Sequence, residues 1–247
     1  MLELDLWLEI AKSAALEGGN YLLQNQGKEL KVLMDSGRDI KLQLDTDTEK
    51  LIKESLSSQS SFSILGEETG LSNNLGEFYW VVDPLDGTSN FLRDIPISCV
   101  SIALMQDVTP ILGVIYDFNH DDLYFGHQNS KAFLNQNEIT VSDYSKKNQS
   151  TLVTGIPAKT HYSDEEFKNM INDFQDWKKV RMIGSAAMAA IYVAAGKAET
   201  YKENGIFLWD IAAGAAIVEA AGGVASITNI QADYRVDAIF TNQHLAN

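Results

Sequence analysis

The run Asp-Pro-Leu-Asp-Gly-Thr at positions 83–88 places two carboxyl groups three residues apart, directly after a hydrophobic stretch. Two ionised carboxylates about 4 Å apart repel each other by roughly 4 kcal/mol at an effective dielectric constant near 20. A site that holds both Asp83 and Asp86 must therefore protonate one of them or bind a cation. The backbone N–H groups of Gly87 and Thr88 would form a phosphate cradle if they begin a helix. The alternative is that both aspartates only form solvated turns.

The spacing of this run also bears on the nucleophile. Phosphatases with an Asp-x-Asp-Gly-Thr motif form a covalent phosphoaspartate on the first aspartate, two residues before the second. In this chain that position is Pro84, which has no nucleophilic side chain. The sequence therefore favours a metal-activated water molecule as the nucleophile.

Two further acidic groups lie at the ends of predicted secondary-structure elements. Gly-Glu-Glu-Thr at positions 66–69 comes directly after a predicted strand, and Asp210 stands at the start of a predicted helix. Taken separately, the first is consistent with a solvated turn and the second with a helix cap. The occurrence of all three acidic groups in this order favours a shared site.

In combination, Gly66-Glu67-Glu68, the run 83–91 and Trp209-Asp210 with Gly222-Gly223 downstream resemble the inositol monophosphatase family over nearly the whole chain. This family belongs to the magnesium-dependent, lithium-sensitive sugar phosphatases, together with fructose-1,6-bisphosphatase. The resemblance implies a mixed α/β fold layered as an α/β/α/β/α sandwich. It also implies a homodimer.

The resemblance further implies a metal site. Glu67, Asp83 and the backbone carbonyl of Leu85 would hold one Mg²⁺, and Asp83, Asp86 and Asp210 would hold a second. Carboxylate and carbonyl oxygens are the ligands that Mg²⁺ prefers. By the same resemblance, Glu67 and Thr88 would orient and deprotonate the attacking water.

A third, weaker Mg²⁺ position of the family falls on Asp45. Here the family's usual Val-Thr pair before that aspartate is replaced by Lys41-Leu42. The alternative for Asp45 is that its charge merely favours a helix N-terminus.

Substrate contacts follow from the resemblance as well, and they fall on Asp86, Gly87, Thr88, Ser89, Ala186, Glu203 and Asp210. The continuation Ser-Asn-Phe at 89–91 resembles the inositol-phosphate branch of the family. Glu203 matches a glutamate that contacts ring hydroxyls, and the alternative is that Glu203 is a solvated turn acid.

Our hypothesis is a Mg²⁺-dependent phosphomonoesterase for inositol monophosphate or a related small sugar or polyol phosphate. The alternatives are 3′-phosphoadenosine 5′-phosphate, fructose 1,6-bisphosphate or histidinol phosphate as substrate, or a catalytically weak, partner-binding member.

The elements that position these residues are predicted from hydrophobic periodicity. A helix that begins near Leu6 and ends at Gly18-Gly19 or shortly beyond precedes a strand over 40–44 and a helix that begins with a Thr46/Glu49 capping box. Strands over 62–65 and 78–82 end at the acidic groups, and an antiparallel meander runs from 100 to 134. From about residue 140 strands and helices alternate, with helices predicted over 164–174, 185–195 and 210–221. We expect an N-terminal helix-plus-sheet half, 1–141, with most metal ligands, and a C-terminal α/β half, 142–247.

The composition excludes several classes of protein. The chain has 247 residues, 45% of them hydrophobic, and a formal net charge of −15. This length allows one large domain or two small ones with a substantial core. The negative charge disfavours nucleic acid as a partner. The sequence predicts neither a membrane span nor a signal peptide, so we expect a cytoplasmic protein, and the lone Cys99 is expected in the core.

Overall fold

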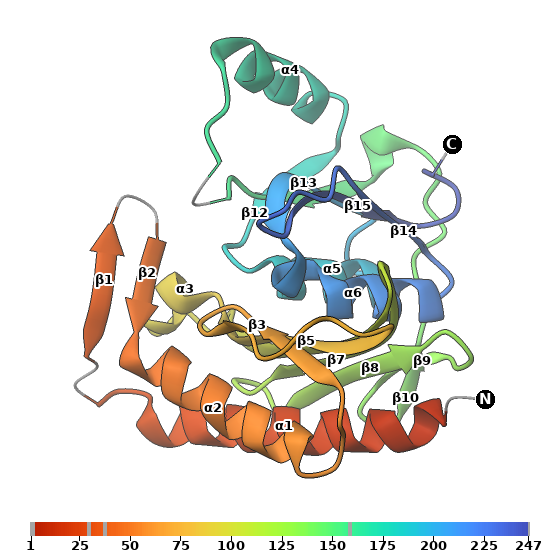
Figure 1. Ribbon diagram of the computed structural model, residues 1–247. Coiled ribbons are helices and arrows are strands. Elements are labelled where there is room, and N and C mark those ends of the chain that lie inside the picture. The colour runs from red at the N-terminus through yellow and green to blue at the C-terminus, as the bar shows by residue number, and fades with distance from the viewer. Residues whose placement is uncertain (1–2, 29–30, 37–38, 158–159, 247) are drawn as a thin grey trace.

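The computed structural model describes residues 3–28, 31–36, 39–157 and 160–246 (Figure 1). Residues 1–2 and 247, the outer ends of the two predicted halves, lie outside this part. The elements, in chain order, are α1 (Leu4–Asn25), β1 (Val32–Ser36), β2 (Asp39–Leu42), α2 (Gln43–Ser57), β3 (Ser63–Gly66), β4 (Gly70–Leu71), β5 (Phe78–Asp86), α3 (Thr88–Phe91), β6 (Cys99–Gln106), β7 (Thr109–Asp117), β8 (Asp122–His127), β9 (Ala132–Leu134), β10 (Asn137–Ile139), the 3₁₀ turn η1 (Lys147–Gln149), β11 (Thr151–Thr154), α4 (Asp164–Phe174), β12 (Lys179–Met182), α5 (Ala186–Ala194), β13 (Thr200–Phe207), α6 (Leu208–Ala220), β14 (Val224–Thr228) and β15 (Arg235–Thr241).

The described strands form two large sheets and one hairpin. The larger sheet has eight strands in the order β10-β9-β8-β7-β6-β5-β3-β4, and the smaller has five in the order β12-β11-β13-β15-β14. Figure 1 shows α1 and α2 below the larger sheet, α5 and α6 between the two sheets, and α4 above the smaller one. This layered arrangement confirms the predicted α/β/α/β/α fold.

The central strands are buried on both faces, which explains their continuous apolar runs. β6 is buried along nearly its whole length, and β5 from Tyr79 to Leu85. One core cluster packs α1 and α2 against the larger sheet, and a second fills the space around α5 and α6 between the sheets. Cys99 is fully buried in the second cluster, as predicted. In the part of the chain that the structure describes, no helix has the length and apolarity needed to cross a lipid bilayer.

The alanine-rich helix α6 lies very close to the larger sheet. A Cβ atom placed on Gly113 of β7 would lie 2.1 Å from the carbonyl oxygen of Ala213. Helix α6, from the predicted C-terminal half, also contacts β6 and β8, which belong to the predicted N-terminal half. The hydrophobic core is therefore continuous between the two predicted halves. The division between residues 141 and 142 stays a prediction.

The start of the second helix differs from the prediction. The strand predicted over 40–44 ends at Leu42, and α2 begins at Gln43, before the expected capping box. The carboxylate of Asp45 accepts a hydrogen bond from the backbone N–H of Leu42 at 2.9 Å, so Asp45 has the role expected of Glu49. Glu49 instead accepts hydrogen bonds from the backbone N–H groups of Glu68 and Thr69.

Two other predictions are corrected near the C-terminal elements. Helix α6 begins at Leu208, and Asp210 lies in its first turn, where its carboxylate accepts from Phe207 N at 3.2 Å. Glu203 lies inside strand β13, which continues to Phe207 through a register shift near Gly205. Strand β1, which pairs with β2 in a hairpin, was not predicted, because its sequence Val-Leu-Met-Asp-Ser carries no regular apolar alternation.

The close approach at Gly113 gives a stability prediction. Gly113→Ala should lower the free energy of unfolding by about 2 kcal/mol or more, because the methyl group forces α6 away from the sheet. Urea denaturation measures this loss. Gly76→Ala is the matched control, since a Cβ there would meet its nearest neighbour at an ordinary 3.7 Å. Equal effects of the two substitutions would contradict the proposed close packing.

Candidate active site

A bulge at the end of β5 brings Asp83 and Asp86 to the same site. In a regular strand, residues three apart point to opposite faces. Here Asp83 is opposite Ser101 and Asp86 is opposite Cys99, so β5 has one residue more than β6 between these two pairs. Such a bulge re-aims side chains and often lies beside an active site.

The turn after the bulge requires a glycine. Gly87 has a φ of +90°, and a Cβ there would lie 2.6 Å from the carbonyl oxygen of Ile97. Helix α3 begins immediately afterwards at Thr88. The Thr88 hydroxyl donates to the Leu85 carbonyl at 3.0 Å, which fixes its side chain against the bulge.

Elements from distant parts of the chain complete the site. Glu67 lies in the turn between β3 and β4, and its backbone N–H donates to Val82 O at 3.1 Å. Asp210 comes from the first turn of α6. Asp86 accepts hydrogen bonds from Ser185 Oγ at 2.6 Å and from Ala187 N at 2.7 Å, so it is tied to the N-terminus of α5.

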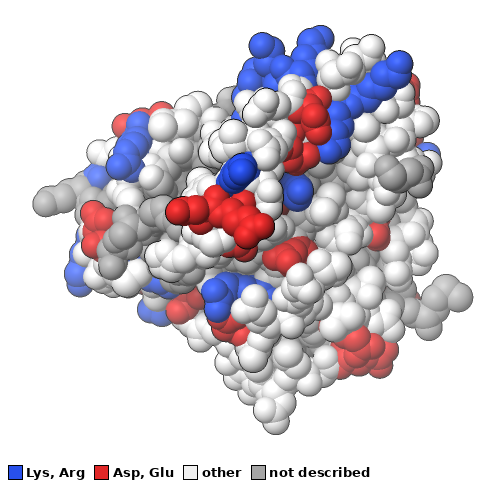
Figure 2. All heavy atoms as spheres, turned by 90° about the horizontal axis from the view of Figure 1, so that it is seen from above, with Lys and Arg blue, Asp and Glu red and all other residues white. Residues whose placement is uncertain are grey.

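These residues surround one pocket with a volume of about 280 Å³. It brings together most of the predicted site residues, namely Glu67, Asp86, Gly87, Thr88, Ser89, Ala186, Glu203 and Asp210. Asp83 and Leu85 are buried next to it in β5, and Asp45 is buried at the start of α2. On the face seen in Figure 2, acidic side chains gather beside and within a hollow of the surface.

Burial and mutual repulsion disfavour the ionised form of the carboxyl groups of this site and raise their pKa values. Burial, followed by the charges of acidic neighbours, raises the pKa of Glu67 to about 8. Burial raises the pKa of Asp83 well above its ordinary value, and the charges of Glu67 and Asp86 add to this. The pKa of Asp210 is raised well above its ordinary value for the same reasons, and burial raises that of Asp86 to about 6. Such shifts are typical of functional sites.

The donor set fits magnesium. Four carboxylates and the Leu85 carbonyl are hard oxygen donors, and a carbonyl that already accepts from Thr88 retains a second lone pair. In the described residues, no three acidic, His or Cys side chains already converge on one point. Divalent cations between the carboxylates would relieve the repulsion that raises their pKa values.

Glu203 forms part of the pocket wall away from the β5 bulge. It is 8% exposed, and burial followed by the charge of Asp86 raises its pKa to about 8. A Cβ on Gly155 would lie 2.4 Å from Glu203 Oε1, so the neighbouring strand β11 is followed by a residue that leaves room for this carboxyl group. The solvated-turn alternative for Glu203 is therefore wrong.

Sequence reasoning missed two contacts at the site. Ser185 was predicted as the start of a helix, and its hydroxyl also donates a hydrogen bond to Asp86. Lys41 forms an ion pair with Glu68 at 3.1 Å beside Glu67. Neither contact has a local sequence signal, because the partners lie 99 and 27 residues apart.

Comparison with known proteins agrees with this geometry. The sequence profile described as "Inositol monophosphatase family" matches residues 3–243. A protein of Xylella fastidiosa named Nus factor SuhB is 38% identical, covering 87% of this chain and 80% of its own. A protein of Aquifex aeolicus named fructose-1,6-bisphosphatase/inositol-1-monophosphatase is 34% identical, covering 91% and 86%. The structure of an inositol monophosphatase from Anabaena superposes with a TM-score of 0.85 at 33% identity, covering 98% and 92%.

The raised pKa values predict how stability depends on pH without metal. Ordinary values of 4.5 for Glu67 and 3.8 for Asp86 rise to about 8 and about 6 in the folded protein. Between these limits the folded state binds more protons than the unfolded state, so the free energy of unfolding falls as pH rises. Each such group contributes at most about 1.4 kcal/mol per pH unit.

Thermal denaturation in EDTA from pH 5 to 8 measures this dependence. We expect the melting temperature to fall with pH, and Mg²⁺ to restore it at pH 8 because the cation stabilises the ionised carboxylates. Glu67→Gln should flatten the slope in EDTA. A melting temperature that rises with pH in EDTA would contradict the proposed protonated cluster.

Proposed function

The chain belongs to the inositol monophosphatase family, a family of phosphoric monoester hydrolases, and we propose that it hydrolyses inositol monophosphate or a related small sugar or polyol phosphate with Mg²⁺. The observation that carries this proposal is the pocket lined by Glu67, Asp86 and Asp210, beside the buried Asp83. These carboxyl groups come from three different elements, and all have raised pKa values. Acidic residues clustered on a solvated surface would not have pKa values raised by burial.

We propose that two magnesium ions bind at this site. Glu67, Asp83 and the Leu85 carbonyl are the proposed ligands of the first, and Asp83, Asp86 and Asp210 those of the second. When bound, the ions neutralise phosphate charge and activate water. The buried location supports this assignment, because electrostatic interactions are stronger away from bulk water.

The chain's own residues would then perform the remaining steps. The Thr88 hydroxyl, which donates to Leu85 O, still has lone pairs with which to accept a hydrogen bond from the attacking water. Glu67 lies in the same pocket as Thr88, and its carboxylate, once ionised beside the bound cations, would accept the proton of that water. Backbone N–H groups at Gly87, Thr88 and Ser89 would orient the phosphate.

The leaving group would lie between the phosphate and Glu203. Glu203 and Ala186 line the pocket with Gly155 and Ile206, so hydroxyl groups of a polyol can reach the Glu203 carboxyl group. A carboxyl group accepts or donates hydrogen bonds to hydroxyls, which supports a polyhydroxylated leaving group. We also propose, from the family, inhibition by lithium, a homodimer and a cytoplasmic location.

A second candidate function is binding to a protein partner with little catalysis. It is favoured by the relative named Nus factor SuhB. Against it, every proposed ligand of the two magnesium ions is present and lies at or beside one pocket. The absence of a nucleic acid partner, which the net charge of −15 suggests, stays a prediction.

A substrate panel tests the proposed function. Phosphate release should depend on Mg²⁺ and should be fastest with inositol 1-phosphate among inositol 1-phosphate, fructose 1,6-bisphosphate, histidinol phosphate and 3′-phosphoadenosine 5′-phosphate. Preference for another member would change the substrate but not the reaction class. Folded protein that releases no phosphate from any of them would contradict the proposal and favour the partner-binding function.

A single isosteric substitution tests the second magnesium position. Asp210→Asn keeps an oxygen that can accept from Phe207 N, so α6 retains its first turn. It removes the proposed ligand charge, and kcat/KM should fall by more than about 100-fold, since even outer partners of metal ligands contribute about 10- to 100-fold. Asp164→Asn, in the exposed first turn of α4, is the control and should retain full activity. Retained activity in Asp210→Asn would contradict the two-metal assignment.

A further inference from the structure

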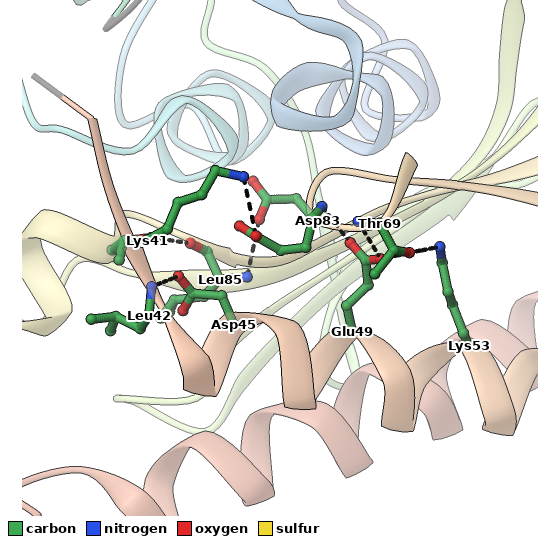
Figure 3. Close-up of polar contacts among 10 residues, drawn as sticks. Lys41, Leu42, Asp45, Glu49, Lys53, Thr69, Asp83 and Leu85 are labelled. Carbon is green, nitrogen blue, oxygen red and sulfur yellow. Dashed lines mark hydrogen bonds and ion pairs between the residues drawn. The ribbon is translucent and has the colours of Figure 1, made fainter. Parts of the chain in front are cut away.

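Lys41 places a positive charge at the edge of the acidic pocket. Its Nζ lies 3.1 Å from Glu68 Oε2, and the two side chains are 25% and 5% exposed. The charge of Lys41 also lowers the pKa values of Glu67 and Asp45 against the raising effect of burial. Figure 3 shows Lys41 extending from its strand across the cluster that holds Asp45 and Asp83.

Asp45 is the buried carboxyl group on this side of the pocket. It is 2% exposed; its Oδ2 accepts from Leu42 N, and its Oδ1 has no hydrogen-bond partner among the described residues. A buried carboxylate oxygen without a donor needs a nearby positive charge. The Lys41 ammonium group supplies a positive charge that acts on Asp45.

A second buried ion pair close by has a different role. Lys53 Nζ lies 3.1 Å from Glu49 Oε1, with side chains 16% and 0% exposed. Glu49 also accepts from the backbone of Glu68 and Thr69, so this pair holds the turn between β3 and β4 in place. Lys53 and Lys41 are thus similar in burial and pairing, but they flank different carboxyl groups (Figure 3).

We propose that the Lys41 ammonium group takes the place of a third divalent cation beside Asp45 and Glu68, so that this protein binds two divalent cations per chain. The inference rests on the proposed two-metal function. An ammonium group and a divalent cation within a few ångströms repel each other strongly in a partly buried site. The Lys41 side chain therefore neutralises part of the negative charge of the pocket's carboxylates. This proposal replaces the third magnesium ion that the sequence analysis assigned to Asp45.

Counting bound metal tests this inference without reference to activity. Mn²⁺ serves as the probe, and equilibrium dialysis at saturation gives the number of ions per chain. The wild-type protein should bind two. Lys41→Met should bind three, because removing the ammonium group leaves Glu68 and Asp45 to a metal ion. The double variant Lys41→Met/Asp45→Asn should return to two.

Two further variants make the result specific. Lys53→Met removes a lysine of similar burial from the neighbouring ion pair and should leave the count at two. Asp45→Asn alone keeps an acceptor for Leu42 N and should also leave the count at two, which tests the inference even where Lys41→Met does not fold.

The outcomes separate this inference from the proposed function. A count of three in the wild-type protein, a count of two in folded Lys41→Met, or a lower count in Asp45→Asn overturns the role of Lys41 and leaves the phosphatase proposal intact. A wild-type count below two contradicts both.

Discussion

The repulsion among buried carboxyl groups around Asp83 is the constraint on which the rest of the site depends. Asp83 is 1% exposed, and its pKa is raised by burial and then by three acidic neighbours. Packing of the surrounding sheet and helices must supply the free energy that holds these groups together without a cation. A divalent cation would relieve this repulsion, and the packing of the large apolar core on both faces of the eight-stranded sheet offsets its cost.

The same carboxyl groups also connect the layers of the fold. Asp86 joins β5 to the N-terminus of α5, through Ser185 and Ala187, and Asp210 closes the first turn of α6. Both helices lie between the two sheets, so the proposed metal ligands sit where the layers meet. Residues that would bind metal are thus already fixed by contacts that serve the fold. This preorganisation reduces the cost of assembling the site on binding.

The layered fold and most of the residues that line the pocket were predictable, because their signals are local or belong to a recognisable family. The run 83–88 ends a buried strand. Its two aspartates and its glycine lie within six residues, so they can be recognised as a motif from the local sequence alone. Other features depend on distant partners. Glu203 was predicted outside the strand that ends near residue 201, yet pairing with β15 continues β13 through it to Phe207. Glu49 looked like part of a capping box, but its partners are 19 and 20 residues away, and nothing near Ser185 announces its bond to Asp86.

The backbone of the turn that carries Glu67 is held by a buried carboxyl group of helix α2. Buried Glu49 binds the backbone N–H groups of residues 68 and 69, and a Cβ on Gly66 would lie 2.4 Å from the Glu49 carboxyl carbon. Main-chain hydrogen bonds do not depend on which side chain is present. The backbone of the turn is therefore held without the acids at positions 67 and 68, whereas a side chain at position 66 would displace the Glu49 carboxyl group that holds it.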